Sequence, residues 1–184
     1  YYLNKKNCIL RAKIKVNNLV SKNLFLSIGF KITGKDKDFF EMEFIRKLEF
    51  KKVGKSDVDI LYELLRNRKH NISHNIMPEF DVHKNFVDSN PYLHWYKFSL
   101  DKKVIGTFYI KSDNSIGLNL NVLNKAIVSE ILEFILRNFS PQKPVASQIP
   151  NYFFVNVPEN NNDLKNIIES LGHSKLQVSY KLFN

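Results

Sequence analysis

The pattern of apolar and polar residues changes its period along the chain, and each period predicts a different element. Residues 9–16 alternate with a period of two, which is typical of a β-strand. Residues 21–28 place their apolar positions on one face of a helix, and Gly29 is well suited to end it. Residues 30–32 and 39–45 then predict two strands joined by a turn. This N-terminal stretch is too short to fold stably alone.

The remainder of the chain predicts a longer alternation of strands and helices. In order, the pattern predicts a strand at 48–53, a helix that follows Ser56, a short helix at about 82–87, strands at 92–100, 104–110 and 116–122, a helix at 125–138, strand-like segments at 145–149 and 152–157, a helix at 163–171 and a strand at 176–183. Ser56 is a good N-cap, with Asp59 at the capping-box position. The three central strands predict an antiparallel meander, because short polar turns separate them.

One segment occurs twice, at residues 18–30 and 161–173. The identical pairs are Asn18/Asn161, Lys22/Lys165, Asn23/Asn166, Ser27/Ser170 and Gly29/Gly172, and the apolar pairs are Leu24/Ile167, Phe25/Ile168 and Ile28/Leu171. The copies lie about one small domain apart, so we expect a complete domain at residues 48–184 and the C-terminal portion of a second one at residues 1–47. The alternative is a chance match, which a chain rich in Asn, Lys, Ile and Leu makes easily.

The composition fits one ordinary folded domain plus a fragment. Hydrophobic residues make up 43% of the 184 residues and aromatic ones 13%, which is enough for a core. No apolar run in the sequence approaches the roughly 18 residues needed to cross a bilayer, so we expect no membrane partner. The single cysteine, Cys8, excludes an internal disulfide framework and a Cys-based zinc site. We therefore expect a reduced, cytoplasmic setting.

The formal net charge of +10 would attract polyanions such as nucleic acid, an anionic membrane or phosphorylated small molecules. The lysines are scattered, however, and pairs such as 5–6, 51–52 and 102–103 never extend into a block. A solvated, lysine-rich surface is therefore favoured over a dedicated nucleic-acid face. We expect no nucleic-acid partner.

The predicted order of elements resembles that of the GNAT superfamily of N-acetyltransferases, and the repeat is similar to that superfamily's closing unit, Asn-x-x-(Ser/Ala)-…-(Leu/Ile)-Gly-Phe. Further matching segments are Leu65-Arg66-Asn67 with Ile72-Ser73, His83 and Phe86 within 82–87, Ile105-Gly106, and the stretch 35–40. On these segments the chain most resembles acetyltransferases that act on amino-sugar nucleotides. The implied fold class is α+β: a GNAT-like mixed, mainly antiparallel sheet flanked by helices, preceded by a partial second GNAT-like unit.

The resemblance implies acetyl-CoA as the acyl donor. In the family, backbone groups of the fourth strand hold the pantetheine arm. A Gly-rich turn and the next helix N-terminus hold the pyrophosphate, since free N–H groups and the helix dipole favour anions. The matching stretch, 120–129, contains no glycine, which puts close approach of its backbone to phosphate in doubt. The expected cofactor-binding residues are Leu120, Asn121, Val122, Asn124, Lys125, Ala126 and Asn161.

Two of these residues have an alternative interpretation. Lys125 either contacts a phosphate directly or merely lies at an exposed helix start. Asn161 either bonds the pantetheine or caps its helix.

Amine acetylation needs a base for the amine proton and an acid for the departing thiolate. The family's acid is a tyrosine in the closing helix, but that place holds Ile167 or Ile168 here. As the catalytic base the resemblance implies His83, because an ordinary histidine pKa near neutrality suits the task. The alternative is a surface histidine on a short helix. Glu79, acting through water, is a second candidate base.

The expected acceptor-binding residues are Arg66, Asn67 and Glu79. Arg66 would meet an anionic acceptor such as a nucleotide phosphate, or would cap its own helix C-terminus. His70 and His74 are weaker base candidates. With His83 they have no carboxylate at metal-ligand spacing, so we expect no metal site.

The leading hypothesis is an acyl-CoA-dependent N-acetyltransferase acting on a small-molecule amine, with an amino sugar or sugar nucleotide as the acceptor class. The alternative is a GNAT-fold binding or scaffolding module that has lost acetyl transfer, which the glycine-free turn and the absent tyrosine favour. A nucleic-acid-binding module rests only on the charge. Residues 1–47 would complete their sheet with residues upstream, with a partner subunit such as the second copy in a homodimer, or against the second domain.

Overall fold

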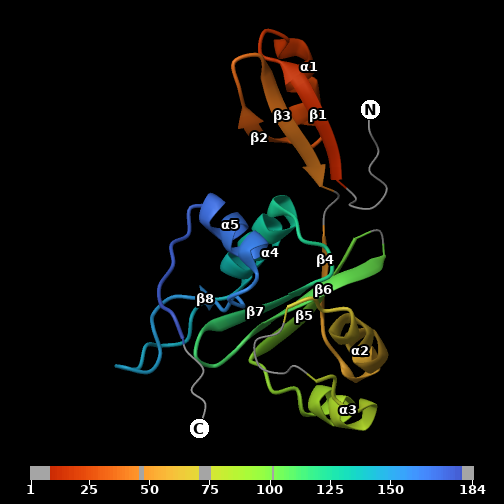
Figure 1. Cartoon of the computed structure of the whole chain (residues 1–184), viewed down its shortest axis with the longest axis vertical. Coiled ribbons are helices and arrows are strands. Elements are labelled where there is room, and N and C mark those ends of the chain that lie inside the picture. Colours follow the sequence, from red (N-terminus) through yellow and green to blue (C-terminus); the bar gives the residue numbers. More distant parts are fainter. Residues whose placement is uncertain (1–8, 46–47, 71–75, 101, 180–184) are drawn as a thin grey trace.

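Two β-sheets organise the chain in the computed structural model, which describes residues 9–45, 48–70, 76–100 and 102–179. Figure 1 shows the smaller sheet above the larger one. The smaller sheet has three strands and the larger one has five. The predicted α+β class is confirmed, because mainly antiparallel sheets flanked by helices make up both parts.

The smaller sheet belongs to the N-terminal unit, residues 9–45. This unit contains β1 (Ile9–Lys15), α1 (Leu19–Ser27), β2 (Lys31–Lys35) and β3 (Phe39–Ile45). Both β1 and β2 pair with β3 in antiparallel register, which gives the order β1-β3-β2. The buried core of this unit is small and consists of Ile14, Phe30, Phe40 and Met42. The predicted order of strand, helix, strand, strand is confirmed.

The larger unit, residues 48–179, carries the five-stranded sheet. It contains β4 (Glu49–Lys52), the 3₁₀ turn η1 (Lys55–Asp57), α2 (Val58–Arg66), α3 (Phe80–Ser89), β5 (His94–Leu100), β6 (Lys103–Ile110), β7 (Ser115–Leu120), α4 (Lys125–Asn138), β8 (Phe154–Val155) and α5 (Asn162–Ser170). The strands lie in the order β4-β5-β6-β7-β8, and all neighbours are antiparallel except β7 and β8. The predicted meander is confirmed as β5, β6 and β7, and the helix predicted at 125–138 is α4.

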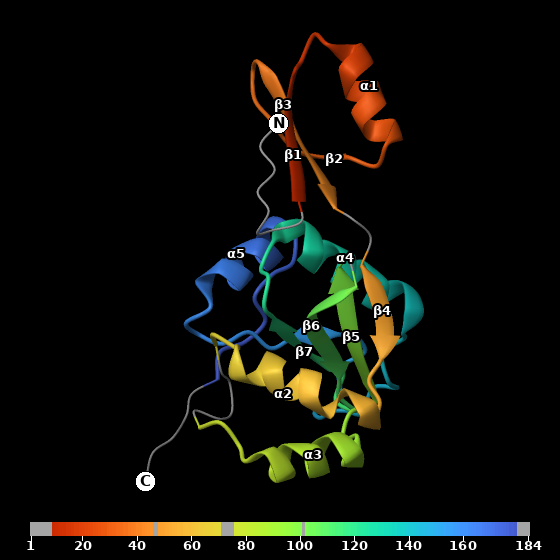
Figure 2. The ribbon, with the colours of Figure 1, turned by 90° about the vertical axis from the view of Figure 1, so that its right-hand side faces the viewer.

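Helices cover both faces of the five-stranded sheet, as the two views in Figures 1 and 2 show. On one face, α4 buries Ile127, Ile131 and Ile135 in a cluster with Phe98 and Phe108. On the other face, residues of α2 and α3 form a second buried cluster with the sheet: Val53, Val58, Leu61, Leu64, Val87 and Trp95. β5 contributes to both clusters because successive side chains of a strand point to opposite faces.

The two copies of the repeated segment adopt the same local structure, one in α1 and the other in α5. The shared hydrogen bonds are the caps from Ser21 N–H to Asn18 Oδ1 (3.0 Å) and from Leu164 N–H to Asn161 Oδ1 (3.2 Å), and the hydroxyl bonds from Ser27 to Leu24 O and from Ser170 to Ile167 O (both 2.8 Å). Each helix is followed by a glycine in the left-handed region, Gly29 at φ +97° and Gly172 at φ +91°. The repeat is therefore one of structure as well as of sequence.

The sequence prediction is wrong at the C-terminal end. Residues 173–179 form no strand, and the rest of the predicted strand, 180–183, lies outside the described residues. A strand needs a partner for its backbone groups and an apolar surface for its side chains. Leu176 and Val178 remain 60% and 55% exposed, so they have no such surface.

The segment between α4 and α5 contains less strand than its pattern predicts. Residues 145–149 form only an isolated bridge between Val145 and Ile149, and the strand expected at 152–157 shortens to β8. Pro150 lies between the two and has no N–H to donate to a ladder. Strand pairing is therefore interrupted at Pro150, between the two segments that the pattern predicts to be strand-like.

The start of α2 also differs from the prediction. The N-cap of α2 is Asp57, whose side chain bonds the preceding turn η1: Gly54 N–H donates to Asp57 Oδ2 at 2.9 Å, and Asp57 N–H donates to Gly54 O at 3.0 Å. The nearly buried Asp57 carboxylate also forms an ion pair with Lys97 of β5. This tertiary partner explains why Asp57, and not Ser56 with Asp59, organises the turn.

The close packing at Gly106 gives a testable prediction. A Cβ at this position of β6 would lie 2.4 Å from Phe98 Cζ and 2.5 Å from Asn119 O, and Phe98 is fully buried. We expect Gly106→Ala to lower the free energy of unfolding by about 1–3 kcal/mol through overpacking, measured by urea denaturation. Gly54→Ala is the control, because no atom lies within 4 Å of a Cβ there and its φ is −131°. An equal loss in both variants would contradict the prediction.

Candidate functional site

β7 and β8 are paired at one end and separate at the other. Their parallel pairing joins Ser115 to Phe154 and Ile116 to Val155, and Asn156 N–H donates to Ile116 O at 3.0 Å. Beyond Ile116, β7 continues to Leu120 with β6 as its only strand neighbour among the described residues. The two strands therefore diverge and leave one edge of β7 open.

The register of β7 determines which backbone groups face this open edge. At the end of β7, Asn121 N–H donates to Ile105 O at 3.0 Å. Residues of an antiparallel strand alternate between bonding to their neighbour and facing away from it. Leu118 and Leu120 therefore direct their N–H and C=O groups away from β6. An extended ligand can hydrogen-bond these groups in the way that an added β-strand would.

The turn after β7 leads directly to the N-terminus of α4. Asn124 is the N-cap, because its side-chain oxygen accepts the N–H of Ala126 at 2.8 Å. The N–H groups of Lys125 and Ile127 have no acceptor within the described part of the chain, so they remain able to meet an anion. The side chain of Asn124 therefore occupies the N–H of Ala126 and leaves those of Lys125 and Ile127 available to an anion.

Lys125 reaches across to α5 instead of extending into solvent. Its Nζ donates to Ser170 O at 3.1 Å, at the C-terminal end of α5. Carbonyl groups at a helix C-terminus lack helical donors and attract cations. A phosphate at the start of α4 would compete with this carbonyl for Lys125.

Asn161 caps the N-terminus of α5, which is one of the two roles that its position in the sequence allows. The residue is 9% exposed and accepts the N–H of Leu164. The next turns of α5 pack Ile167 and Ile168 against a cluster that includes Val128 of α4. The place where the resemblance implies a catalytic tyrosine is therefore an apolar contact between helices.

His83 is buried between α3 and α2, so the alternative of a surface histidine is wrong. It is 6% exposed, its Nε2 lies 3.3 Å from Val58 O, and its ring packs beside that of Tyr62. Burial lowers the pKa of His83 below its ordinary value of 6.5, and the hydrogen bond to Val58 partly opposes this shift. The imidazole is neutral near pH 7, with Nε2 donating, which leaves Nδ1 as the atom that could accept a proton.

The residues expected to bind the acceptor lie at the ends of α2 and α3 and are exposed. Arg66 pairs with Glu63, with 2.5 Å between Nη2 and Oε2. Asn67 is the C-cap of α2 and donates its side-chain N–H to Glu63 O at 2.9 Å. Glu79 lies at the N-cap of α3 but makes no side-chain cap bond. These three side chains belong to the layer opposite α4.

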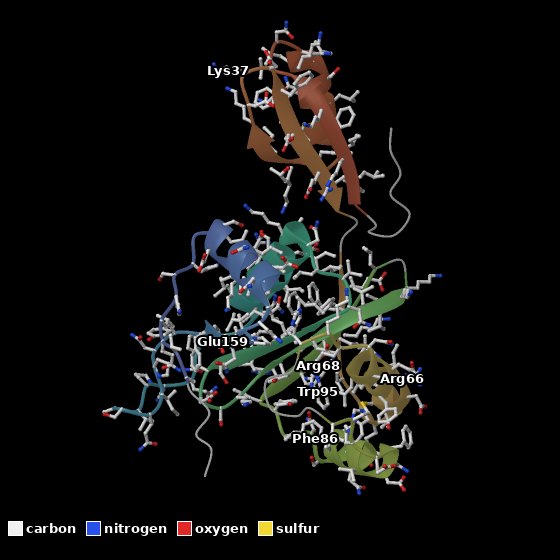
Figure 3. The ribbon with its side chains drawn as sticks, in the orientation of Figure 1. Lys37, Arg66, Arg68, Phe86, Trp95 and Glu159 are labelled. Atoms are coloured by element: carbon white, nitrogen blue, oxygen red, sulfur yellow. The ribbon has the colours of Figure 1, made fainter. Side chains whose placement is uncertain are left out.

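One contact connects the two groups of candidate residues. His70 Nδ1 lies 3.2 Å from Asn160 Oδ1, which joins the segment after α2 to the segment that leads into α5. Figure 3 labels Arg68 and Glu159, which belong to these two segments. His74 lies outside the described residues. The predicted cofactor and acceptor residues thus come from different layers that meet at this contact.

Asn119 of β7 is a candidate that the sequence reasoning missed. Its Oδ1 is buried and accepts no hydrogen bond within the described part of the chain. Asn119 and Gly117 lie on the same face of β7. The ring of Tyr109 covers Gly117 and packs against the α2 and α3 cluster, so this face of β7 is the one directed toward α2 and α3. A buried acceptor without a donor costs free energy, so a ligand N–H or O–H would stabilise it. The only sequence signal is a polar residue between two leucines of a strand.

Two other kinds of site were searched for in the described ranges. No group of three or more His, Cys, Asp or Glu side chains there is arranged to hold a metal ion. No helix in those ranges has the length and apolar character needed to cross a membrane.

Comparisons with known proteins find likeness only in structure. No family model matches the chain, and no curated protein matches it by sequence. A possible acetyltransferase from Clostridium difficile 630 is 13% identical with a TM-score of 0.48, covering 76% of this chain and 98% of the other. An aminoglycoside acetyltransferase from an uncultured soil metagenomic sample, in complex with sisomicin, is 12% identical with a TM-score of 0.45, covering 74% and 95%. A predicted acetyltransferase with acetyl-CoA from Clostridium acetobutylicum is 12% identical with a TM-score of 0.41, covering 74% and 96%.

At these identities and TM-scores the likeness decides nothing about activity. It concerns the outline of the fold. The function proposed for this chain therefore rests on the geometry around β7 and α4.

The burial of His83 gives a prediction about acid stability. Because burial lowers its pKa in the folded protein, the unfolded chain binds more protons once the pH falls below the ordinary value of 6.5. The free energy of unfolding should therefore decrease from pH 7 to pH 5, and His83→Leu should make that decrease smaller. Urea denaturation at both pH values measures it. The exposed His173→Leu is the control, and an unchanged pH dependence in His83→Leu would contradict the prediction.

Proposed function

We propose that this chain is an acyl-CoA-dependent N-acetyltransferase of the GNAT type that binds acetyl-CoA along the open edge of β7. The observation that carries the proposal is the divergence of β7 from β8 beside the N-terminus of α4. The backbone groups of Leu118 and Leu120 suit the amides of a pantetheine arm. The N-terminus of α4 suits a pyrophosphate. In this proposal the cofactor lies along residues 118–126.

The chemistry is direct transfer. The acceptor amine attacks the thioester carbonyl carbon, a C–N bond forms, the C–S bond breaks, and CoA leaves as a thiolate. The amine loses one proton and the thiolate gains one. We assign the base to His83 through Nδ1, with Glu79 acting through water as the second candidate. Since Ile167 and Ile168 occupy the place of the tyrosine, water is the proposed proton source for the thiolate.

The proposed acceptor is a small amine of the amino-sugar or sugar-nucleotide class. Glu79 and the buried Oδ1 of Asn119 offer acceptors for ammonium and hydroxyl groups, and Arg66 offers a partner for a nucleotide phosphate. Arg66 and Glu79 belong to the α2 and α3 layer, and Asn119 lies on the face of β7 that this layer covers. An amine held there would have to reach the thioester across the open edge of β7.

A second candidate function is binding or scaffolding without acetyl transfer. It is favoured by the side chain of Asn124, which already occupies the N–H of Ala126, and by the bond that ties Lys125 to Ser170. Both contacts compete with a pyrophosphate. Isothermal titration with acetyl-CoA separates the two functions, and no detectable heat of binding at millimolar acetyl-CoA would reject the enzyme.

The position of Lys125 gives a prediction for cofactor affinity. If a phosphate draws Lys125 from Ser170, then Lys125→Glu places a negative charge against the pyrophosphate and should weaken acetyl-CoA binding about tenfold or more. Lys84→Glu makes the same charge change on α3, in the opposite layer, and should leave the affinity unchanged. Equal affinities of the two variants would remove Lys125 from the site.

Two substitutions of Asn161 separate capping from binding. Asn161→Ala removes the cap and should lower the free energy of unfolding by about 1 kcal/mol, whereas Asn161→Asp keeps an acceptor for Leu164 N–H and should preserve stability. If the amide N–H also bonds the pantetheine, the Asp variant should bind acetyl-CoA more weakly while unfolding normally. Titration calorimetry and urea denaturation measure the two effects. Full affinity in the Asp variant would restrict Asn161 to capping.

A further inference from the structure

One fully buried side chain joins the head of β7 to the connection that leads from α4 to β8. Asn114, in the turn between β6 and β7, is 0% exposed. Its Oδ1 accepts Gln142 N–H at 2.7 Å, and its Nδ2 donates to Gln142 O at 3.3 Å and to Pro150 O at 2.7 Å. Gln142 lies before the bridge between Val145 and Ile149, and Pro150 lies after it. A single amide therefore holds this connection on both of its sides.

The backbone of Asn114 makes a further contact with β8. Its carbonyl oxygen accepts Phe154 N–H at 3.3 Å, directly before the pair of Ser115 and Phe154 that begins the ladder. Its φ is 67°, a left-handed conformation that asparagine adopts more readily than most residues. Side chain and main chain of one residue thus fix the place where β8 meets β7.

β8 needs such a constraint because its ladder with β7 is only two residue pairs long; Figure 1 shows it beside β7. Val155 and Val157 pack on the cluster formed by α4 and α5, but apolar packing is non-directional. Because the side chains of a strand alternate, a slide of β8 by two residues along β7 would keep Val155 on the same face. The packing alone therefore does not select the observed register.

The slide that preserves two pairs is the one toward the C-terminal end of β7. In the other direction β8 would pass Ser115, the first residue of β7, and lose its partner. In the observed register Asn156 N–H donates to Ile116 O. A slide of two residues would bring this donor to Leu118 O and, in the pattern of a parallel ladder, Leu118 N–H to Phe154 O. The protein's own strand would then occupy groups that the proposed function assigns to the cofactor.

We propose that Asn114 is a positioning residue for the open edge of β7. By clamping Gln142 and Pro150 to the head of β7, it fixes the register of β8 and keeps β8 away from Leu118. This inference rests on the proposed function, in which Leu118 and Leu120 bind the pantetheine arm. Asn114 does not touch the cofactor and acts through β8.

The test replaces Asn114 by glycine, which keeps the left-handed backbone and removes only the side-chain clamp. NMR follows the hydrogen exchange of Leu118 N–H, and isothermal titration measures the affinity for acetyl-CoA. Only molecules in the observed register expose Leu118 N–H and bind the cofactor. The exchange rate and the affinity should therefore fall by the same factor, about threefold or more. Asn90→Gly, at the exposed left-handed position after α3, is the matched control and should change neither.

A merely structural clamp would speed amide exchange when removed and would not slow that of Leu118. Three results would overturn the proposal: unchanged or faster exchange of Leu118 in Asn114→Gly, slower exchange with full affinity for acetyl-CoA, and an equal effect of Asn90→Gly. If the unmodified chain does not bind acetyl-CoA, the proposed function fails, while the exchange of Leu118 still decides the role of Asn114. Asn114→Asp, which keeps an acceptor for Gln142 N–H but no donor for Pro150 O, repeats the test should Asn114→Gly lose its circular dichroism signal.

Discussion

The short pairing between β7 and β8 is the constraint on which the proposed site depends. Two residue pairs join these strands, and their hydrogen bonds alone would hold β8 weakly. Apolar packing behind the sheet holds it instead, since Val155 and Val157 pack on the cluster of Val128, Leu132 and Leu164. β8 can therefore lie beside β7 without continuing along it. The backbone groups of Leu118 and Leu120 on this edge are therefore not used by β8.

The α2 and α3 layer packs closely on the other side of the sheet. Tyr92 stacks on Tyr109 with 3.9 Å between ring centroids, and Phe86 and Trp95 pack edge-on against Tyr92; Figure 3 labels Phe86 and Trp95 in this layer. The ion pair between Asp57 and Lys97 fixes the start of α2 to β5. His83 is buried in this layer, and Asn119 of β7 lies on the face of the sheet that the layer covers. In the proposed function this layer is the preformed surface that the acceptor amine meets.

The accuracy of the sequence predictions depends on whether an element is determined locally. α4 begins and ends where its pattern predicts, because Asn124 caps it and its isoleucines recur on one face. The cap of α2 is different, because Lys97 lies far away in sequence and selects Asp57. The strand expected after α5 is absent at residues 176–179 for the same kind of reason, since alternation does not supply a partner. The buried state of His83 also depends on α2, which no local pattern reveals.

The repeated segment separates the two levels most clearly. The sequence by itself determined the helix, its asparagine cap, its serine hydroxyl bond and its glycine end, because each involves residues within one or two turns. It did not determine whether the apolar face would be buried. α4 lies against Ile167 and Leu171, whereas the described chain places no helix against Leu24 and Ile28. Burial is a property of the neighbour as much as of the helix, so only the tertiary structure decided it.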